Sequence, residues 1–284
     1  MKKATLILIL VLIGFYAFMF FFASGKEYKA EKAFYGAGKI LNKIKLNPEA
    51  TPPAMFESVE SRLENIVKRY PDTGIAKRAY VILAEVYITD KKYDRALSIL
   101  DTFKAKYEKE PALLARAHFL KGVAYEKQGK WDRALEEFYI LKTEYVNTTF
   151  GLQIPLYVAN HYAKEGKAVQ AEEEYNSAAA FYTKLEKENA GSLLGYASSS
   201  FLIQTYMELG KYEEAGRVVE ETIANYPGAT VLMQQLPYVE IIFVNTLKNT
   251  QKAISIYESV LKKANDANLK NALEAKIKAL KSKK

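Results

Sequence analysis

KQGKWDRALEEFYILKTEY, residues 127–145, is one of three closely similar lines in this chain. TDKKYDRALSILDTFKAKY occupies residues 89–107, and ELGKYEEAGRVVEETIANY occupies residues 208–226. Each line has the same length, places an aromatic residue three positions before an alanine, and ends on tyrosine. One line repeated at distant positions predicts an architecture built by stacking copies of a single unit.

The alanine of each line marks the repeat, and two further matches extend the series. These marker alanines recur every 37 to 44 residues, at Ala96, Ala134, Ala171, Ala215 and Ala253. A period in that range indicates a solenoid of helix pairs. Apolar residues three and four positions apart predict helices throughout residues 27–281, and no strand pattern is found. We therefore expect an all-α helix-turn-helix solenoid of about five to six helix pairs.

Each repeat joins its two helices in the same way. A small residue in the first helix allows the marker alanine of the second to come close, and a bulky residue four positions later fills the flank. Glycines predict left-handed caps in the turns between the helices, at Gly129, Gly166 and Gly210. Prolines predict the ends of second helices, at Pro71, Pro111 and Pro227. The wide spacing after Ala171 predicts longer helices or a loop at residues 186–195.

This pattern resembles the tetratricopeptide repeat (TPR) family over roughly residues 27–269. The long period, with RYP at residues 69–71 and NYP at residues 225–227, is most similar to the bacterial cell-envelope subgroup. That subgroup includes the TPR lipoprotein of the outer-membrane β-barrel assembly machinery and membrane-anchored periplasmic TPR proteins. This chain departs from the lipoprotein because it has no cysteine. The resemblance implies a scaffold or chaperone-like adaptor rather than an enzyme.

Residues 4–23, ATLILILVLIGFYAFMFFFA, form an uncharged run of twenty between Lys3 and Lys26. At about 1.5 Å per residue, a helix of that length spans a hydrocarbon core of about 30 Å. We expect residues 1–26 to be a transmembrane anchor; a cleavable signal peptide ending near Gly25 is the alternative. The basic amino terminus favours a single-pass protein of the inner membrane with its remaining residues periplasmic or otherwise extracytoplasmic.

The solenoid is expected over residues 27–266, and a carboxy-terminal capping helix with a Lys-rich tail over residues 267–284. That helix carries Leu269, Leu273, Ile277 and Leu280 on one face, which suits capping of the open end. An amphipathic helix on a membrane surface is the alternative. Of the net charge of +8, residues 1–46 and 262–284 each carry +6, so the body between them carries −4. A mildly acidic body argues against nucleic-acid binding.

Few side chains suggest a catalytic or metal-binding role. The chain has no cysteine and only two histidines, His118 and His161. A metal or acid–base role needs several converging ligands or carboxylates, which the neighbouring sequence does not assemble around either one. We therefore expect no catalytic, metal or cofactor site, and we place both histidines in the core or along a groove.

What remains is a surface for binding. In the TPR family the first helices line a concave groove, which implies a protein-binding groove at Arg78, Glu85, Arg116, Phe119, Tyr157, Asn160, Gln204 and Tyr238. Arginine, amides and aromatic rings suit peptide recognition, whereas packing between repeats is the alternative role. The expected partners are proteins or peptides of the cell envelope, in secretion or envelope assembly. A self-assembling structural oligomer and a cleaved soluble periplasmic adaptor are the alternatives.

Overall fold

The structure is a computed structural model of the 284-residue chain and describes residues 14–15 and 25–282. The expected anchor, residues 4–23, lies outside the described residues except for Gly14 and Phe15. Within the described ranges, no helix combines the length and the apolar character needed to cross a membrane.

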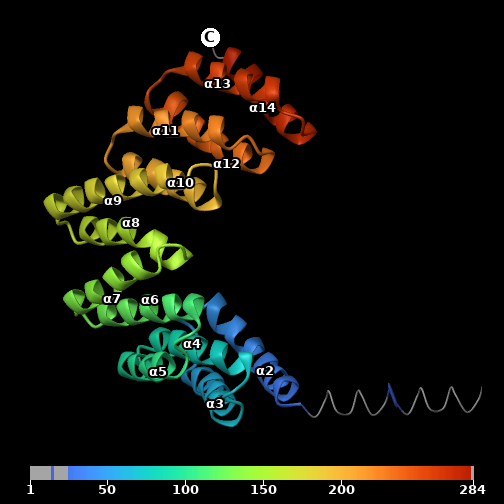
Figure 1. Cartoon of the computed structure of the whole chain (residues 1–284), viewed down its shortest axis with the longest axis vertical. Helices are drawn as coiled ribbons and strands as arrows, with labels where there is room; N and C mark the ends of the chain where they lie inside the picture. Colours follow the sequence, from blue (N-terminus) through green and yellow to red (C-terminus); the bar gives the residue numbers. More distant parts are fainter. Residues whose placement is uncertain (1–13, 16–24, 283–284) are drawn as a thin grey trace, which may run out of the picture. The chain divides into compact units, whose positions relative to one another are not determined.

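From Lys26 to Ser282 the chain is helical with short connections, and this part contains no strand (Figure 1). This confirms the predicted all-α fold of helix pairs. We call the even-numbered helices α2 to α12 the first helices and the odd-numbered helices α3 to α13 the second helices. The elements are α2 (Lys26–Leu46), α3 (Pro53–Arg69), α4 (Gly74–Thr89), α5 (Tyr93–Lys106), α6 (Pro111–Lys127), α7 (Trp131–Glu144), α8 (Thr149–Lys164), α9 (Ala168–Glu188), α10 (Leu193–Glu208), α11 (Tyr212–Asn225), α12 (Ala229–Val239), the π-helical segment η1 (Glu240–Thr246), α13 (Thr250–Lys263) and α14 (Ala267–Lys281).

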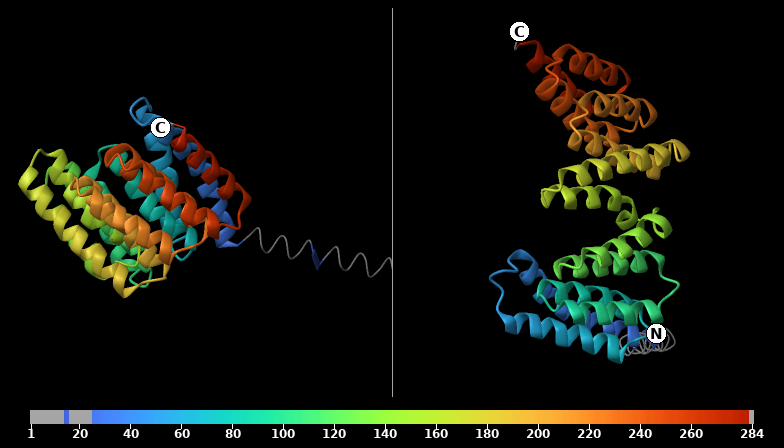
Figure 2. Two further views of the ribbon diagram at one scale, coloured as in Figure 1. Left: turned by 90° about the horizontal axis from the view of Figure 1, so that it is seen from above. Right: turned by 90° about the vertical axis from the view of Figure 1, so that its left-hand side faces the viewer.

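The helices form two compact units, which divide between Gly151 and Leu152 inside α8. In the first unit, α4 packs against α2, α3, α5 and α6. In the second unit, α10 packs against α9 and α11, and α13 packs against α14 and η1. Each unit is a stack of helix pairs (Figure 2). The repeat pattern gives no sign of the division, because the marker alanines continue through it with ordinary spacing.

The predicted packing of small against large side chains is seen between α6 and α7. A Cβ atom added to Gly122 would lie 2.3 Å from the Phe138 ring. Phe138 and the marker Ala134 are both buried. Glycine at position 122 is therefore required by the close approach of the two helices.

Left-handed residues close the turns within the pairs, as predicted. Gly129, Gly166 and Gly210 have φ angles of 74°, 71° and 68°. Lys91 and Lys248 take the same conformation two residues before their second helices, with φ angles of 59° and 55°. For a residue with a side chain, this conformation is about 1 kcal/mol less favourable than the right-handed one, because Cβ approaches a backbone carbonyl oxygen. These two turns are therefore less stable than their glycine counterparts.

Proline marks the end of a second helix at two of the three predicted positions. The helices α3 and α11 each end two residues before a proline, at Pro71 and Pro227. The prediction for Pro111 is wrong, because α5 already ends at Lys106 and Pro111 is the first residue of α6. Proline is favoured there, since the first N–H groups of a helix have no partner within the helix.

The wide spacing between Ala171 and Ala215 comes from a longer helix. The second helices α5, α7, α11 and α13 have 14 residues each, whereas α9 has 21. The additional residues, 182–188, amount to about two helical turns. Of the two predicted explanations, the longer helix is confirmed.

The first added residue, Tyr182, supports the irregular helix α8. Pro155 lies inside α8 and has no N–H group to donate. The Tyr182 hydroxyl donates to the carbonyl of Leu152 at 2.8 Å and accepts from the N–H of Leu156 at 3.3 Å. The hydroxyl thus satisfies backbone groups on both sides of the proline.

The apolar face of the final helix α14 is buried. Leu269, Leu273, Ile277 and Leu280 are buried, and α14 packs on α13. Lys281 of α14 also pairs with Glu258 of α13 at 2.7 Å. The four apolar residues therefore contribute to the core of the second unit.

Candidate protein-binding surface

The eight predicted groove residues lie on first helices, and three of them share one register. Glu85, Asn160 and Gln204 each precede a marker alanine by eleven positions. They therefore occupy equivalent positions of α4, α8 and α10.

In the first unit this surface carries an ion pair between neighbouring first helices. The Nε atom of Arg116 in α6 donates to Oε1 of Glu85 in α4 at 2.8 Å, and Nη2 of Arg116 contacts the same oxygen. The side chains of Arg116 and Glu85 are 31% and 25% exposed. Arg78 is exposed, and its guanidinium lies 5.5 Å from the centre of the Phe34 ring. The guanidinium groups of Arg116 and Arg78 thus both interact with other residues of the unit.

Phe119 belongs to an aromatic cluster of the first unit. Its ring centre lies 5.2 Å from that of Phe150 and 6.3 Å from that of Phe138. The side chain is half-buried. These contacts favour the packing role for Phe119, which was the alternative to a binding role.

In the second unit, pairs between amides and tyrosines replace the ion pair. The Tyr175 hydroxyl donates to Oδ1 of Asn160 at 2.6 Å. The Nε2 atom of Gln204 in α10 donates to the Tyr238 hydroxyl in α12 at 3.3 Å. Tyr157 lies three positions before Asn160 in α8 and is half-buried. The predicted residues of this unit therefore lie partly exposed on α8, α10 and α12.

Two residues of this surface are missing from the sequence prediction. The Tyr196 hydroxyl of α10 donates to Oε1 of Gln234 in α12. Tyr196 lies eight positions before Gln204, and Gln234 lies four positions before Tyr238. Spacings of four and eight place residues on one helix face, so this pattern could have identified both.

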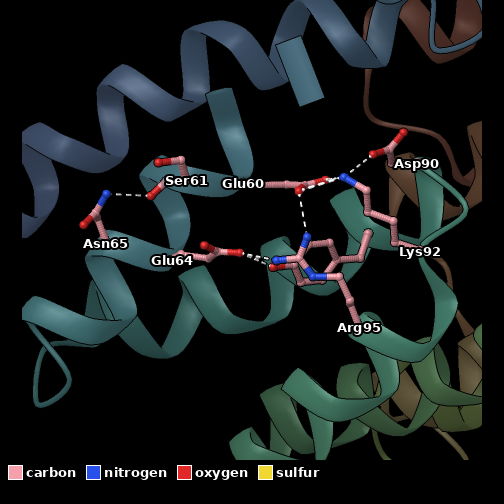
Figure 3. A network of polar contacts seen from close by, with 8 residues as sticks. Glu60, Ser61, Glu64, Asn65, Asp90, Lys92 and Arg95 are labelled. Atoms are coloured by element: carbon pink, nitrogen blue, oxygen red, sulfur yellow. Dashed lines mark hydrogen bonds and ion pairs between the residues drawn. The ribbon is translucent and has the colours of Figure 1, made fainter. Parts of the chain in front are cut away.

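The second helices of the first unit carry a separate polar network (Figure 3). Glu60 of α3 is 4% exposed and accepts from Lys92 at 2.9 Å and from Arg95 at 3.3 Å. Arg95 also donates to Glu64 at 2.7 Å. Burial raises the pKa of Glu60, although the cations of Lys92 and Arg95 oppose this shift. The network links α3 to the start of α5 and has a structural role.

A second buried network joins α6 to α7. Nδ1 of His118 and Nζ of Lys121 each lie 2.6 Å from a different carboxylate oxygen of Glu137. Burial alone would raise the pKa of Glu137, but the hydrogen bonds from His118 and Lys121 outweigh it and lower the pKa. Lys121 also contacts Asp101 at 2.9 Å. Of the two predicted placements of His118, in the core or along a groove, the core is observed, and its carboxylate partner comes from the next helix.

Metal sites and cavities are the remaining kinds of candidate. Within residues 14–15 and 25–282, no three or more His, Cys, Asp or Glu side chains are grouped so that they could hold a metal ion. A cavity of about 270 Å³ is lined by α9, α10 and α11, and one of about 670 Å³ is lined by α9, by Tyr206 of α10 and by Lys211. Both are lined by Thr183 and Lys187 from the added turns of α9 and by Tyr206 of α10.

The helix pair α6–α7 can be compared directly with a known family. Residues 105–145 match the tetratricopeptide repeat family. This TPR match includes the contact between Gly122 and Phe138 and the buried network around Glu137. No curated protein sequence matches the chain.

Solved structures that resemble the chain include three of low sequence identity. A tetratricopeptide repeat protein from Parabacteroides merdae is 15% identical, with 91% of this chain and 88% of that chain covered and a TM-score of 0.41. The TPR2AB domain of yeast Sti1, in a complex with pHSP90, is 13% identical, with 89% and 98% covered and a TM-score of 0.37. Yeast Tom70 is 13% identical, with 92% and 61% covered and a TM-score of 0.42.

Proposed function

We propose that this protein is a TPR scaffold that binds segments of other proteins through the surfaces of its first helices. One observation carries the proposal: polar side chains occupy equivalent positions of α4, α8 and α10 and remain partly exposed, at Glu85, Asn160 and Gln204. The apolar cores of the units are formed by other residues. Side chains that repeat in register outside the core suit contact with an extended partner.

The scaffold is held at the inner membrane by residues 4–23, with its repeats outside the cytoplasm. The twenty uncharged residues and the preceding Lys2 and Lys3 support this placement. In this setting the partners are proteins of the cell envelope, and the protein acts as an adaptor or chaperone in secretion or envelope assembly. The resemblance to the cell-envelope subgroup of TPR proteins favours the same role.

Site-specific photocrosslinking in intact cells tests the scaffold. A photoreactive phenylalanine analogue at Tyr157 should form adducts with other proteins. The matched control is the same analogue at Val169, which is 69% exposed on the second helix α9 of the same unit. Equal adduct formation from both positions would contradict binding by the first helices.

Fractionation and protease accessibility test the membrane placement. Leu10→Lys places a charge in the middle of the uncharged run and should release the protein from the membrane fraction. Lys32→Ala, outside the run, should leave the distribution unchanged. A mature chain shortened near Gly25 and released would favour the soluble adaptor. Loss of self-association on deletion of residues 262–284 would favour the structural oligomer.

A further inference from the structure

We propose that the surface formed by the first helices of the second unit, α8, α10 and α12, selects uncharged, extended polypeptide segments. We call it the neutral surface. The proposal rests on the proposed scaffold function and adds the chemistry of the partner. Three features of the second unit support it: the distribution of charge, the unused hydrogen-bonding atoms, and the register of the repeats.

The helices of the neutral surface carry almost no charge. Residues 149–163, 193–207 and 229–239 contain no Asp, Glu, Lys or Arg. The exceptions in α8 and α10 are their final residues, Lys164 and Glu208. The second helix α11, by contrast, carries charges at Glu213, Glu214, Arg217, Glu220 and Glu221. Within the pairs α8–α9 and α10–α11, charge is therefore concentrated on the second helices.

Three amide side chains of the neutral surface use only one of their two polar atoms. Asn160 and Gln234 each accept a tyrosine hydroxyl through the amide oxygen, and Gln204 donates through its nitrogen. Within the described part of the chain, the other amide atom of each has no hydrogen-bond partner. The amide nitrogens of Asn160 and Gln234 thus remain as donors, and the amide oxygen of Gln204 remains as an acceptor.

These unused atoms match the backbone of an extended peptide. A peptide backbone presents uncharged N–H and C=O groups at regular intervals, which pair with amide acceptors and donors. The tyrosine contacts hold Asn160, Gln204 and Gln234 in place, so less side-chain freedom is lost when a partner binds. The surface is therefore organised for backbone groups before the partner arrives.

The same surface disfavours charged segments. A charged side chain that loses its water here would meet an opposite charge only at the final residues of α8 and α10, Lys164 and Glu208. Burial of a charge without such a partner is unfavourable. In the first unit the position equivalent to Gln204 is Glu85, which meets Arg116. The second unit has an amide at this position and a tyrosine opposite it. Selection thus works by exclusion of charge as well as by attraction of backbone groups.

The test uses the full-length protein in detergent micelles with a photoreactive phenylalanine analogue at Ser200. Ser200 is half-buried in α10 and lies four positions from both Tyr196 and Gln204. The probes are three degenerate libraries of short labelled peptides with blocked ends: one uncharged, one enriched in Asp and Glu, and one enriched in Lys and Arg. The uncharged library should crosslink at least about tenfold more than either charged library, which corresponds to about 1.4 kcal/mol.

Two variants should change this preference. Gln204→Glu introduces the acidic residue that stands at the equivalent position of α4. This variant should lower crosslinking of the uncharged library about tenfold and raise crosslinking of the basic library. Gln234→Glu should act in the same direction at an exposed position, where folding is not at risk. Gln170→Glu, the same change on the exposed face of α9, should have no effect. Circular dichroism verifies that each variant is folded.

The possible outcomes separate the neutral selectivity from the scaffold function. Equal crosslinking of charged and uncharged libraries, or crosslinking of the uncharged library that falls steeply with salt, would overturn the inference. If only charged libraries crosslink, the scaffold function stands and the neutral selectivity is wrong. If no library crosslinks at Ser200 above a probe at Val169, both proposals fail for the second unit.

Discussion

Glu137→Gln tests how far the buried network of α6 and α7 stabilises the first unit. Glutamine has nearly the size of glutamate, but it lacks the charge and turns an NH₂ group toward one of the two donors. The wild-type carboxylate lies 2.6 Å from both His118 and Lys121, and its side chain is 10% exposed. The substitution therefore removes one strong hydrogen bond and leaves Lys121 without its buried counter-charge.

The size of the effect follows from these contacts. A hydrogen bond to a charged group contributes about 1.5–3 kcal/mol, and removal of one partner of a buried ion pair costs about 3–5 kcal/mol. Lys121 keeps Asp101 as a second partner, and that side chain is 61% exposed. The lower end of the range applies, so the free energy of unfolding should fall by about 3 kcal/mol.

Trp131 supplies the assay. It is the only tryptophan of the chain, it begins α7, and its ring centre lies 5.9 Å from that of Phe138. Its fluorescence therefore reports unfolding of the α6–α7 pair. With a urea dependence of about 2 kcal/mol per M, the midpoint of this transition should drop by about 1.5 M. Glu136→Gln, which removes an exposed pair with Arg133, is the control and should cost under about 0.5 kcal/mol.

The effect should also depend on pH. The pKa of Glu137 is lowered in the folded protein from its ordinary value of 4.5, so the ionised carboxylate stabilises the fold above that pH. This stabilisation is lost as the pH falls through the lower, folded value. Wild type and Glu137→Gln should differ at pH 7 and converge in acid below pH 4.5. Equal midpoints at pH 7, or a difference that persists unchanged in strong acid, would refute the reasoning.

Three further substitutions test the packing and the turns. Lys91→Gly should raise the free energy of unfolding by about 0.5–1 kcal/mol in the same urea assay, because glycine tolerates a positive φ; a decrease would argue against strain in this turn. Gly122→Ala should lower it by about 1–3 kcal/mol through overlap with Phe138, and Phe138→Leu in the same chain should restore part of the loss. Tyr182→Phe should cost about 1–3 kcal/mol and accelerate hydrogen exchange of the Leu156 amide, whereas unchanged exchange would contradict the hydroxyl bridge to α8.

The sequence predicts those features of the fold that have local causes. Helix pairs, glycine caps and the bounds of α14 follow from spacing along the chain. Pro111 was misassigned because proline is favoured at the start of a helix as well as after its end. The division inside α8 has no sequence counterpart, since the repeat period continues through it.

The candidate site was predictable only in part. Register along the first helices identifies residues such as Glu85 and Gln204, because equivalent positions of a repeat share a face. Their partners depend on contacts between helices. The tyrosine pairs of Asn160 and Gln204, like the carboxylate beside His118, join residues that no spacing within one helix brings together.

The added length of α9 shows how a repeat can grow without disturbing its neighbours. Seven residues turn an α-helix through nearly two full revolutions, only about 20° short. Residues 182–188 therefore keep the angular phase of the helix. An insertion of five residues would rotate everything after it by roughly half a turn and bury the wrong face. Growth in steps of seven thus lets one repeat gain the wall of two cavities while the apolar core keeps its pattern.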